Sequence, residues 1–270
     1  MKRTLSLAVL IAVAALSAAC GDGAGPGSTM AVRFGTTPTA APVSPFAASG
    51  ASLSSAATLD LAFEGSNGRL TITDLWMIVE EFELEPVETG DCDDDVVEVE
   101  CPDFEQRWFF IQVPVDGSDV QVAVANADGL YDEFEIEVDD AEVDDDDPDD
   151  LADAQLIAEM FADSILPRFP DWPEKASMVV IGTFEPKNLD GTFGPAVDFK
   201  TYFEAEVEIE MPLNPPFDSA VDTEVTVRLN LGAWYSRPDG TVWDLSAIQG
   251  QLVEFEVEME DGFEIEIDND

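Results

Sequence analysis

Apolar and polar residues alternate along most of this sequence, which is the pattern of half-buried β-strands. The runs lie at 30–34, 59–63, 70–84, 108–113, 120–124, 131–138, 178–184, 197–211, 225–231, 253–259 and 263–267. Short stretches rich in Gly, Asp, Asn and Pro separate several of these runs, as expected for turns. The pattern predicts a mainly β protein, which we expect to be an antiparallel β-sandwich-like domain.

The run at 70–84 is predicted to form the central strand. Six apolar residues share one parity in it: Leu70, Ile72, Trp76, Ile78, Phe82 and Leu84. Met77 and Val79 place apolar side chains on the other parity as well. A strand with apolar residues on both faces is typical of the middle of a covered sheet.

One α-helix is predicted, at about 148–166, inserted into or covering the β domain. Pro148 suits the first helical position, and the acidic residues around it complement the helix dipole. Leu151, Ala154, Ile157, Ala158, Phe161 and Ile165 then recur at helical spacing until Pro167. A helix lying on a membrane would carry Lys and Arg on its polar side, so this apolar stripe is predicted to pack on the sheet.

Other segments give more local predictions. Residues 36–57 are predicted to form a long loop, and the runs 108–113 and 120–124 a hairpin across Asp116-Gly117-Ser118. The run 197–211 is predicted to be one unusually long strand that ends before Pro215 and Pro216. Asp239-Gly240 is predicted to close a second hairpin.

The C-terminus predicts a hairpin with a defined register. A three-residue loop at 260–262, with Gly262 in the left-handed conformation, pairs Met259 with Phe263 and Val257 with Ile265. This register places two pairs of glutamates directly opposite each other. They are Glu258 with Glu264 and Glu256 with Glu266.

The first twenty residues, MKRTLSLAVLIAVAALSAAC, have a basic start, an apolar stretch too short to span a bilayer, and small residues before a cysteine. They resemble the signal of bacterial lipoproteins, although Ser17 stands where that family usually has leucine. The resemblance implies cleavage of residues 1–19 and lipidation of Cys20. Plain secretion or an uncleaved anchor is the alternative. The composition of residues 20–28 predicts a flexible tether. Residues 29–270 are long enough for one all-β domain or two small ones, and we assign them to a single β-rich domain.

The same resemblance predicts a lipid-anchored protein of the cell envelope. Gly21 is not the aspartate that retains such proteins at the inner membrane in enteric bacteria, so an outer-membrane address is favoured. The domain would then lie in the periplasm or at the cell surface. Contact with the membrane is expected through the N-terminal lipid alone.

The formal net charge of −48 excludes nucleic acids and anionic membrane faces as electrostatic partners, because phosphate binding requires clustered Lys and Arg. The sequence also contains no histidine, which removes Ser-His-Asp triads, Cys-His pairs and His-ligated zinc. Any catalysis would therefore have to rely on carboxylates, and we assign no catalytic residues. A protein or glycan partner is left open.

Cys92 and Cys101 stand on either side of the acidic stretch DDDVVEVE, and Cys20 is expected to carry the lipid. In an exported protein the natural prediction is a disulfide between them, worth about 2.5–3 kcal/mol. A metal site is the alternative, but two thiols without further soft ligands are too few.

Glutamates fill the polar positions of several strands, in particular 133–137 and 204–210. Such rows, with Glu256, Glu258, Glu264 and Glu266, predict that the fold depends on cations. No cofactor is expected, with Ca²⁺ as the alternative because it prefers hard carboxylate oxygens. Neither acidic stretch, at 91–95 or 139–150, has the glycine and glutamate of an EF-hand loop.

Several blocks of the sequence also resemble a group of bacterial envelope lipoproteins of unassigned function with a β-rich domain. The blocks are DLWMIVEEFELEPV at 74–87, the acidic stretch between the cysteines, DGLYDEFEIEV at 128–138, FKTYFEAEVEIEMPL and VTVRLNLGAWYSRPDG. They are strand and turn patterns without an active-site signature. The resemblance therefore implies fold and compartment, and adds nothing about chemistry.

These observations favour a non-enzymatic interaction or structural module over two alternatives. The first alternative is a carbohydrate-binding or carbohydrate-active protein, in which Trp234, Tyr235 and Trp243 would stack on sugars. Core packing of these aromatic residues is the preferred interpretation. The second alternative is an envelope protein that binds divalent cations.

Overall fold

The computed structural model describes residues 29–37, 61–87, 104–126, 130–141, 150–205, 207–218, 223–254 and 262–269. Several predictions fall outside these ranges. They are the signal and tether at 1–28 with Cys20, the loop at 36–57 beyond residue 37, the disulfide between Cys92 and Cys101, and Glu256 and Glu258.

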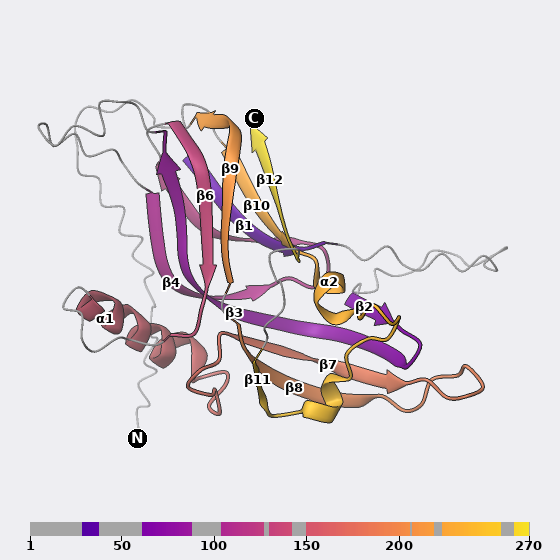
Figure 1. Ribbon diagram of the computed structural model, residues 1–270. Coiled ribbons are helices and arrows are strands. Elements are labelled where there is room, and N and C mark those ends of the chain that lie inside the picture. Colours follow the sequence, from indigo (N-terminus) through magenta and orange to yellow (C-terminus); the bar gives the residue numbers. More distant parts are fainter. Residues whose placement is uncertain are drawn as a thin grey trace, which may run out of the picture.

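The described strands form two sheets (Figure 1). A four-stranded sheet has the order β12 (Phe263–Asn269), β10 (Thr223–Leu229), β1 (Thr29–Thr36), β5 (Asp119–Asn126). An eight-stranded sheet contains β11 (Leu252–Glu254), β8 (Val197–Glu204), β7 (Met178–Pro186), β3 (Gly68–Pro86), β6 (Leu130–Val138) and β9 (Val207–Asp218) in that order. In addition, β2 (Leu61–Glu64) and β4 (Phe104–Val113) pair with β3.

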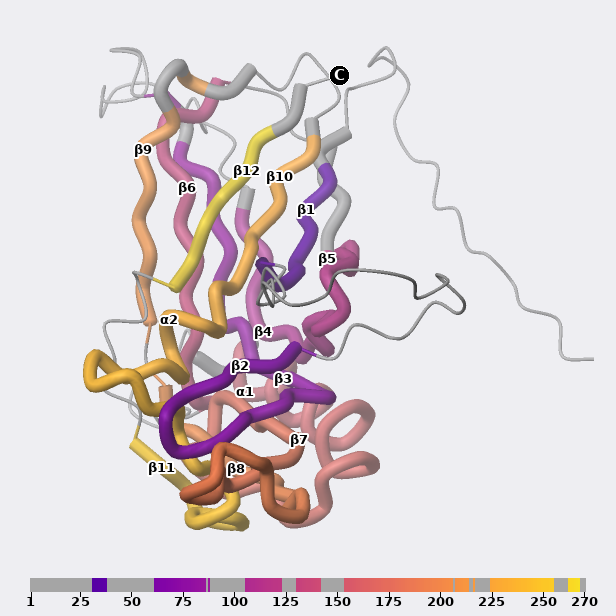
Figure 2. Tube along the Cα trace, turned by 90° about the vertical axis from the view of Figure 1, so that its right-hand side faces the viewer, coloured from indigo at the N-terminus to yellow at the C-terminus, as the bar shows by residue number. Residues whose placement is uncertain are grey.

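The prediction of a mainly β, sandwich-like domain is confirmed. Most neighbouring strands are antiparallel, but β1 pairs in parallel with β10, and β8 with β11, so both sheets are mixed. Figure 2 shows β12, β10, β1 and β5 side by side in one layer, with β7 and β8 at the other end of the molecule.

The core between the sheets consists of the inward positions of both layers. The four-stranded sheet supplies Val32, Phe34, Val225 and Val227, and the eight-stranded sheet supplies Phe82, Leu84, Phe134, Ile136 and Ile209, all buried. A second apolar cluster lies on the other face of the eight-stranded sheet. It contains Ile78, Trp108, Ile157, Ile165, Trp172, Val179 and Tyr202.

Strand β3 is central, as predicted, since it pairs with β2, β4, β6 and β7. The predicted burial of both faces in its middle is confirmed, because Met77 and Val79 lie in the core and Ile78 lies in the second cluster. A bulge between Ile72 and Asp74 moves Leu75, Met77 and Val79 to the core face. Opposite the bulge the backbones approach so closely that a Cβ on Gly182 would overlap the carbonyl oxygen of Thr71.

The predicted helix is present as α1 (Asp150–Met160), which continues into a π-helical turn, η1 (Phe161–Ile165). Ile157, Met160 and Ile165 are buried in the second cluster, which confirms that the helix covers the sheet. Ala158, assigned to the apolar stripe, is exposed instead. The helix therefore packs through fewer positions than the periodicity predicted.

The strands β4 and β5 do not form the predicted hairpin. They follow each other across residues 114–118, but β4 pairs with β3 and β5 pairs with β1 in the other sheet. The predicted long strand at 197–211 is likewise divided at Ala205 into β8 and β9, which lie at opposite sides of β3. Pro215 and Pro216 lie within β9, which tolerates them because it is an edge strand.

The Asp239-Gly240 turn is present, with Gly240 at φ 79° and a single bridge between Ser236 and Val242. The segment before it is not a strand. Residues 231–235 form a short helix, α2 (Leu231–Tyr235), and a 3₁₀ turn, η2 (Leu245–Ile248), follows the bridge.

The predicted C-terminal hairpin depends on residues 255–261, which lie outside the described ranges, so its register stays a prediction. Residues 252–254 pair with β8 as β11, and β12 pairs with β10. Gly262 is not left-handed, since the positive-φ glycines are Gly117, Gly191, Gly240 and Gly250. Glycine is required at 262 for another reason, because a Cβ there would overlap the indole of Trp234.

Candidate functional site

Glutamates line up in rows across four neighbouring strands, β4, β3, β6 and β9. In one row Glu83 lies opposite both Glu105 and Glu135, and Glu135 lies opposite Glu210. A second row joins Arg107, Glu81, Glu137 and Glu208 in the same way, and a third pairs Glu85 with Glu133. We call these nine glutamates the acidic face; they are Glu81, Glu83, Glu85, Glu105, Glu133, Glu135, Glu137, Glu208 and Glu210.

The rows result from simple alternation. Side chains of successive strand residues point to opposite faces, so the polar positions of β6 and β9 share one face when their apolar positions share the other. Phe134 and Ile136, between the glutamates, pack in the core between the sheets. Directly opposed side chains have Cβ atoms about 4.5–5.5 Å apart, a distance at which like charges destabilise a sheet.

The acidic face ends at a bend in β3. Val79 is paired with Phe109 and Glu81 with Arg107, but Glu80 and Trp108 between them do not pair. Both Val79 and Phe82 belong to the core, so the alternation of faces is broken at Glu80 and Glu81. On the C-terminal side of the bend β3 pairs with β6, and on the N-terminal side it pairs with β7. The segment of chain that connects β6 to β7 contains α1.

The backbone is strained at this bend. Trp108 has φ 52°, and among the described residues it is the only non-glycine residue with positive φ. A bulky residue in this region of φ costs free energy and is often found next to functional sites. The indole of Trp108 is buried, and its Nε1 has no hydrogen-bond partner within the described chain.

Among the described residues, Arg107 is the cation that contacts the carboxylates of the bend. The guanidinium of Arg107 lies 3.4 Å from Glu80, 3.5 Å from Glu81, 3.3 Å from Glu105 and 2.7 Å from Asp153 of α1. Glu80 and Glu81 are consecutive in β3, yet both reach this guanidinium because the alternation is broken between them. Within the described part of the chain, four carboxylates therefore share one guanidinium at the bend.

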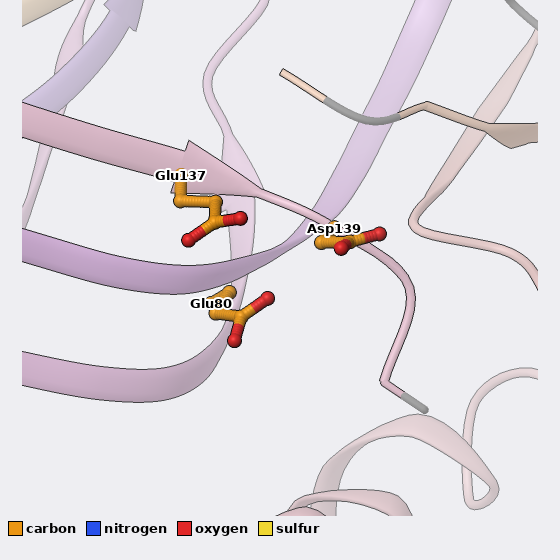
Figure 3. Close-up of side chains that lie close together, drawn as sticks. All are labelled: Glu80, Glu137 and Asp139. Atoms are coloured by element: carbon orange, nitrogen blue, oxygen red, sulfur yellow. The ribbon is translucent and has the colours of Figure 1, made fainter. Parts of the chain in front are cut away.

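Glu80, Glu137 and Asp139 lie together at the bend (Figure 3). One ligand atom from each residue lies within 4.8 Å of the others. This is close enough for carboxylates to share a cation or a proton. Three such groups supply only part of the six to eight oxygen ligands that Ca²⁺ takes.

The pKa values follow from this crowding. Burial, then the charges of Glu137 and Asp139, raises the pKa of Glu80 to about 7. Burial raises the pKa of Glu81 to about 7 although Arg107 opposes the shift. Burial and the neighbouring carboxylates also raise the pKa values of Glu135 and Glu137. These carboxyl groups retain protons at a pH where ordinary glutamates are ionised.

The predicted glutamates at the C-terminus have a different environment. Glu264 and Glu266 lie on β12, opposite Arg228 and Thr226 of β10. Glu266 pairs with Arg228 at 2.8 Å, so a cation rather than a second glutamate neutralises it. Their predicted partners, Glu258 and Glu256, lie outside the described ranges.

The structure brings the predicted row at 133–137 together with Glu208 and Glu210 of the predicted row at 204–210. Glu204 lies in β8 instead, and residue 206 lies outside the described ranges. Sequence reasoning missed Glu80, Glu81 and Arg107 as parts of the site. The signal was the doublet Glu80-Glu81, because two adjacent acidic residues interrupt an otherwise alternating strand.

The aromatic residues considered for sugar stacking are packed in the fold. Trp234 is 2% exposed and Tyr235 is fully buried in the core, as the preferred interpretation predicted. Trp243 is half-buried, and the guanidinium of Arg237 lies 4.7 Å from its ring. No flat aromatic platform is therefore left at Trp234 and Tyr235.

A groove of about 660 Å³ lies between β4 and β5. Its apolar lining includes Phe109, Ile111, Val115, Val120 and Val122, and its polar lining includes Thr73, Gln112, Asp116, Ser118 and Gln121. Within the described strands, β4 and β5 are unpaired on the edges that face this groove. Its size is within the range of small-molecule sites.

Comparison with protein-family models, with curated proteins and with solved structures gave no match. Among the described helices, none is both long and apolar enough to cross a bilayer.

Proposed function

We propose that this protein is a lipid-anchored, non-enzymatic module of the bacterial cell envelope that binds positively charged partners through its acidic face. The lipid on Cys20 would hold it at the outer membrane. The observation that carries the proposal is the row of directly opposed glutamates across β4, β3, β6 and β9.

The physical argument concerns the cost of this arrangement. Each directly opposed pair of like charges costs up to about 1 kcal/mol, out of a folding free energy of only about 5–15 kcal/mol. A partner that brings cations to the face removes part of this cost when it binds. Binding therefore stabilises the fold, and the rows are favourable only in the bound state.

The chemistry of the face also limits the partner. Nucleic acids and anionic membrane surfaces would be repelled by the nine carboxylates of the acidic face. Trp234 and Tyr235 are buried, so they do not offer the exposed aromatic rings on which sugars would stack. A lysine-rich or arginine-rich segment of another envelope protein fits the face best.

Hexalysine is a suitable probe for this binding. The triple variant Glu83→Gln/Glu135→Gln/Glu210→Gln should weaken its affinity about tenfold, because three surface ion pairs of about 0.5 kcal/mol each are lost. Isothermal titration calorimetry at low ionic strength measures the effect.

The control carries Asp163→Asn/Glu174→Gln/Asp198→Asn, which removes three exposed carboxylates away from the face. It should weaken binding by about twofold or less. Equal weakening by both variants would mean that the affinity depends only on the net charge of the protein, and would reject the face as the binding surface. At matched ionic strength, displacement by calcium chloride beyond that by sodium chloride would show that a divalent ion, rather than a basic peptide, is the preferred ligand.

The lipid anchor is tested separately. Wild-type protein should partition into the detergent phase in a phase-separation assay, and Cys20→Ala should move it to the aqueous phase, because the acyl chains supply the membrane affinity. Unchanged partitioning of the variant would reject the anchor and leave the proposal for the acidic face standing.

A further inference from the structure

The bend in β3 gathers charge from six parts of the chain. The described groups that face Glu80 and Glu81 are Glu83 on β3, Glu105 and Arg107 on β4, Glu137 on β6, Asp139 after β6, Asp153 on α1, and Glu208 on β9. Arg107 is the cation among them. The excess of carboxylates is fixed by the register of the strands and by the broken alternation of β3.

These groups are also poorly solvated. The side chains of Glu80 and Glu81 are 16% and 17% exposed, and that of Asp153 is 15% exposed. One guanidinium cannot balance four carboxylates in such a position, since each further charge is repelled by the others and has lost most of its water. Binding a proton is the simplest way to relieve this repulsion.

We propose that the bend is a proton-operated device that increases the stability of the fold as the surroundings become acidic. Uptake of protons by Glu80 and Glu81 removes two negative charges beside Glu137 and Asp139. Arg107 then has only Glu105 and Asp153 as charged partners among its four carboxylates. The ion pair with Asp153, at 2.7 Å, joins the bend to α1. The device works without any partner on the acidic face, so it goes beyond the proposed function.

The direction of the effect follows from linkage. The pKa of Glu80 and that of Glu81 are each about 7 in the folded protein, against an ordinary value of 4.5. The folded state therefore binds protons more tightly than the unfolded state, and the resulting stability is fully present below about pH 4.5 and lost as the pH rises through 7. The protein should be more stable at pH 5 than at pH 8.

Thermal melting between pH 8 and pH 5 tests the device. The melting temperature of the wild type should rise by at least about 4 °C on acidification. In Glu80→Gln/Glu81→Gln, which keeps the shape of both side chains and removes their titration, the protein should already be stabilised at pH 8. Its melting temperature should then rise less on acidification than that of the wild type, with Glu135 and Glu137 supplying the remaining slope. The control Asp163→Asn/Glu174→Gln should retain the wild-type slope.

A double variant whose pH profile runs parallel to that of the wild type would overturn the proposal. Carbon-13 NMR of the labelled glutamate side chains gives a second readout, which needs no stability measurement. Two carboxyl resonances, assigned by loss in Glu80→Gln and Glu81→Gln, should titrate near pH 7. Titration of both in the ordinary glutamate range would equally overturn it.

Discussion

Replacing Arg107 with methionine should lower the free energy of unfolding at pH 8 by about 1–2 kcal/mol. Methionine keeps an apolar stem in the same space but leaves Glu80, Glu81, Glu105 and Asp153 without their shared cation. The estimate is kept low because the side chain of Arg107 is 34% exposed and water screens part of the repulsion. Urea unfolding measures the change.

The matched control is Arg33→Met. The side chain of Arg33 is also 34% exposed, but within the described residues its ion pair is with one carboxylate, that of Glu224, at 2.9 Å. It should cost no more than about 0.5 kcal/mol, as a single surface ion pair does. The loss in Arg107→Met should also shrink at pH 5, where Glu80 and Glu81 hold protons. Equal losses for both variants, or the same loss at both pH values, would contradict the role assigned to Arg107.

The strands could be predicted from the sequence because one face of each is buried, so apolar and polar residues alternate with a period of two. Strands such as β1, β6 and β10 were found where the alternation placed them. Their partners could not be predicted, because strand order depends on contacts between distant segments. This is why β4 and β5 were wrongly joined in a hairpin although a short loop connects them.

Alternation also hides the places where a strand bends. The bulge between Ile72 and Asp74 and the break at Glu80 each shift the inward parity by one, and apolar residues on both parities gave no sign of this. The division of 197–211 at Ala205 was hidden for the same reason, since β8 and β9 continue the same alternation across the bend.

Part of the candidate site could be predicted from the sequence. The glutamates of 133–137 and 207–210 could be recognised as rows, but only the pairing of β6 with β9 makes Glu135 and Glu210 direct neighbours. Arg107 gave no signal at all, because its four carboxylates come from three separate elements. A site of this kind depends on topology, which local pattern does not record.

Neutralising one row of the acidic face should stabilise the protein at low ionic strength. Glu83→Gln/Glu135→Gln/Glu210→Gln removes the repulsion of three opposed pairs, among them Glu83 with Glu105. At up to about 1 kcal/mol for each pair, and with partial screening, the gain should be about 1–2 kcal/mol. Most surface substitutions change stability by less than about 0.5 kcal/mol, so this gain would be distinctive.

The melting temperature of this variant, compared with the wild type in about 10 mM and about 1 M sodium chloride, tests the acidic face most directly. The Debye length falls from about 30 Å to about 3 Å between these conditions. We predict that the variant melts roughly 2–8 °C above the wild type at low salt, and that the difference nearly disappears at high salt. A variant that melts at or below the wild-type temperature at low salt would contradict the account, because the opposed glutamates would then carry no cost for a cationic partner to relieve.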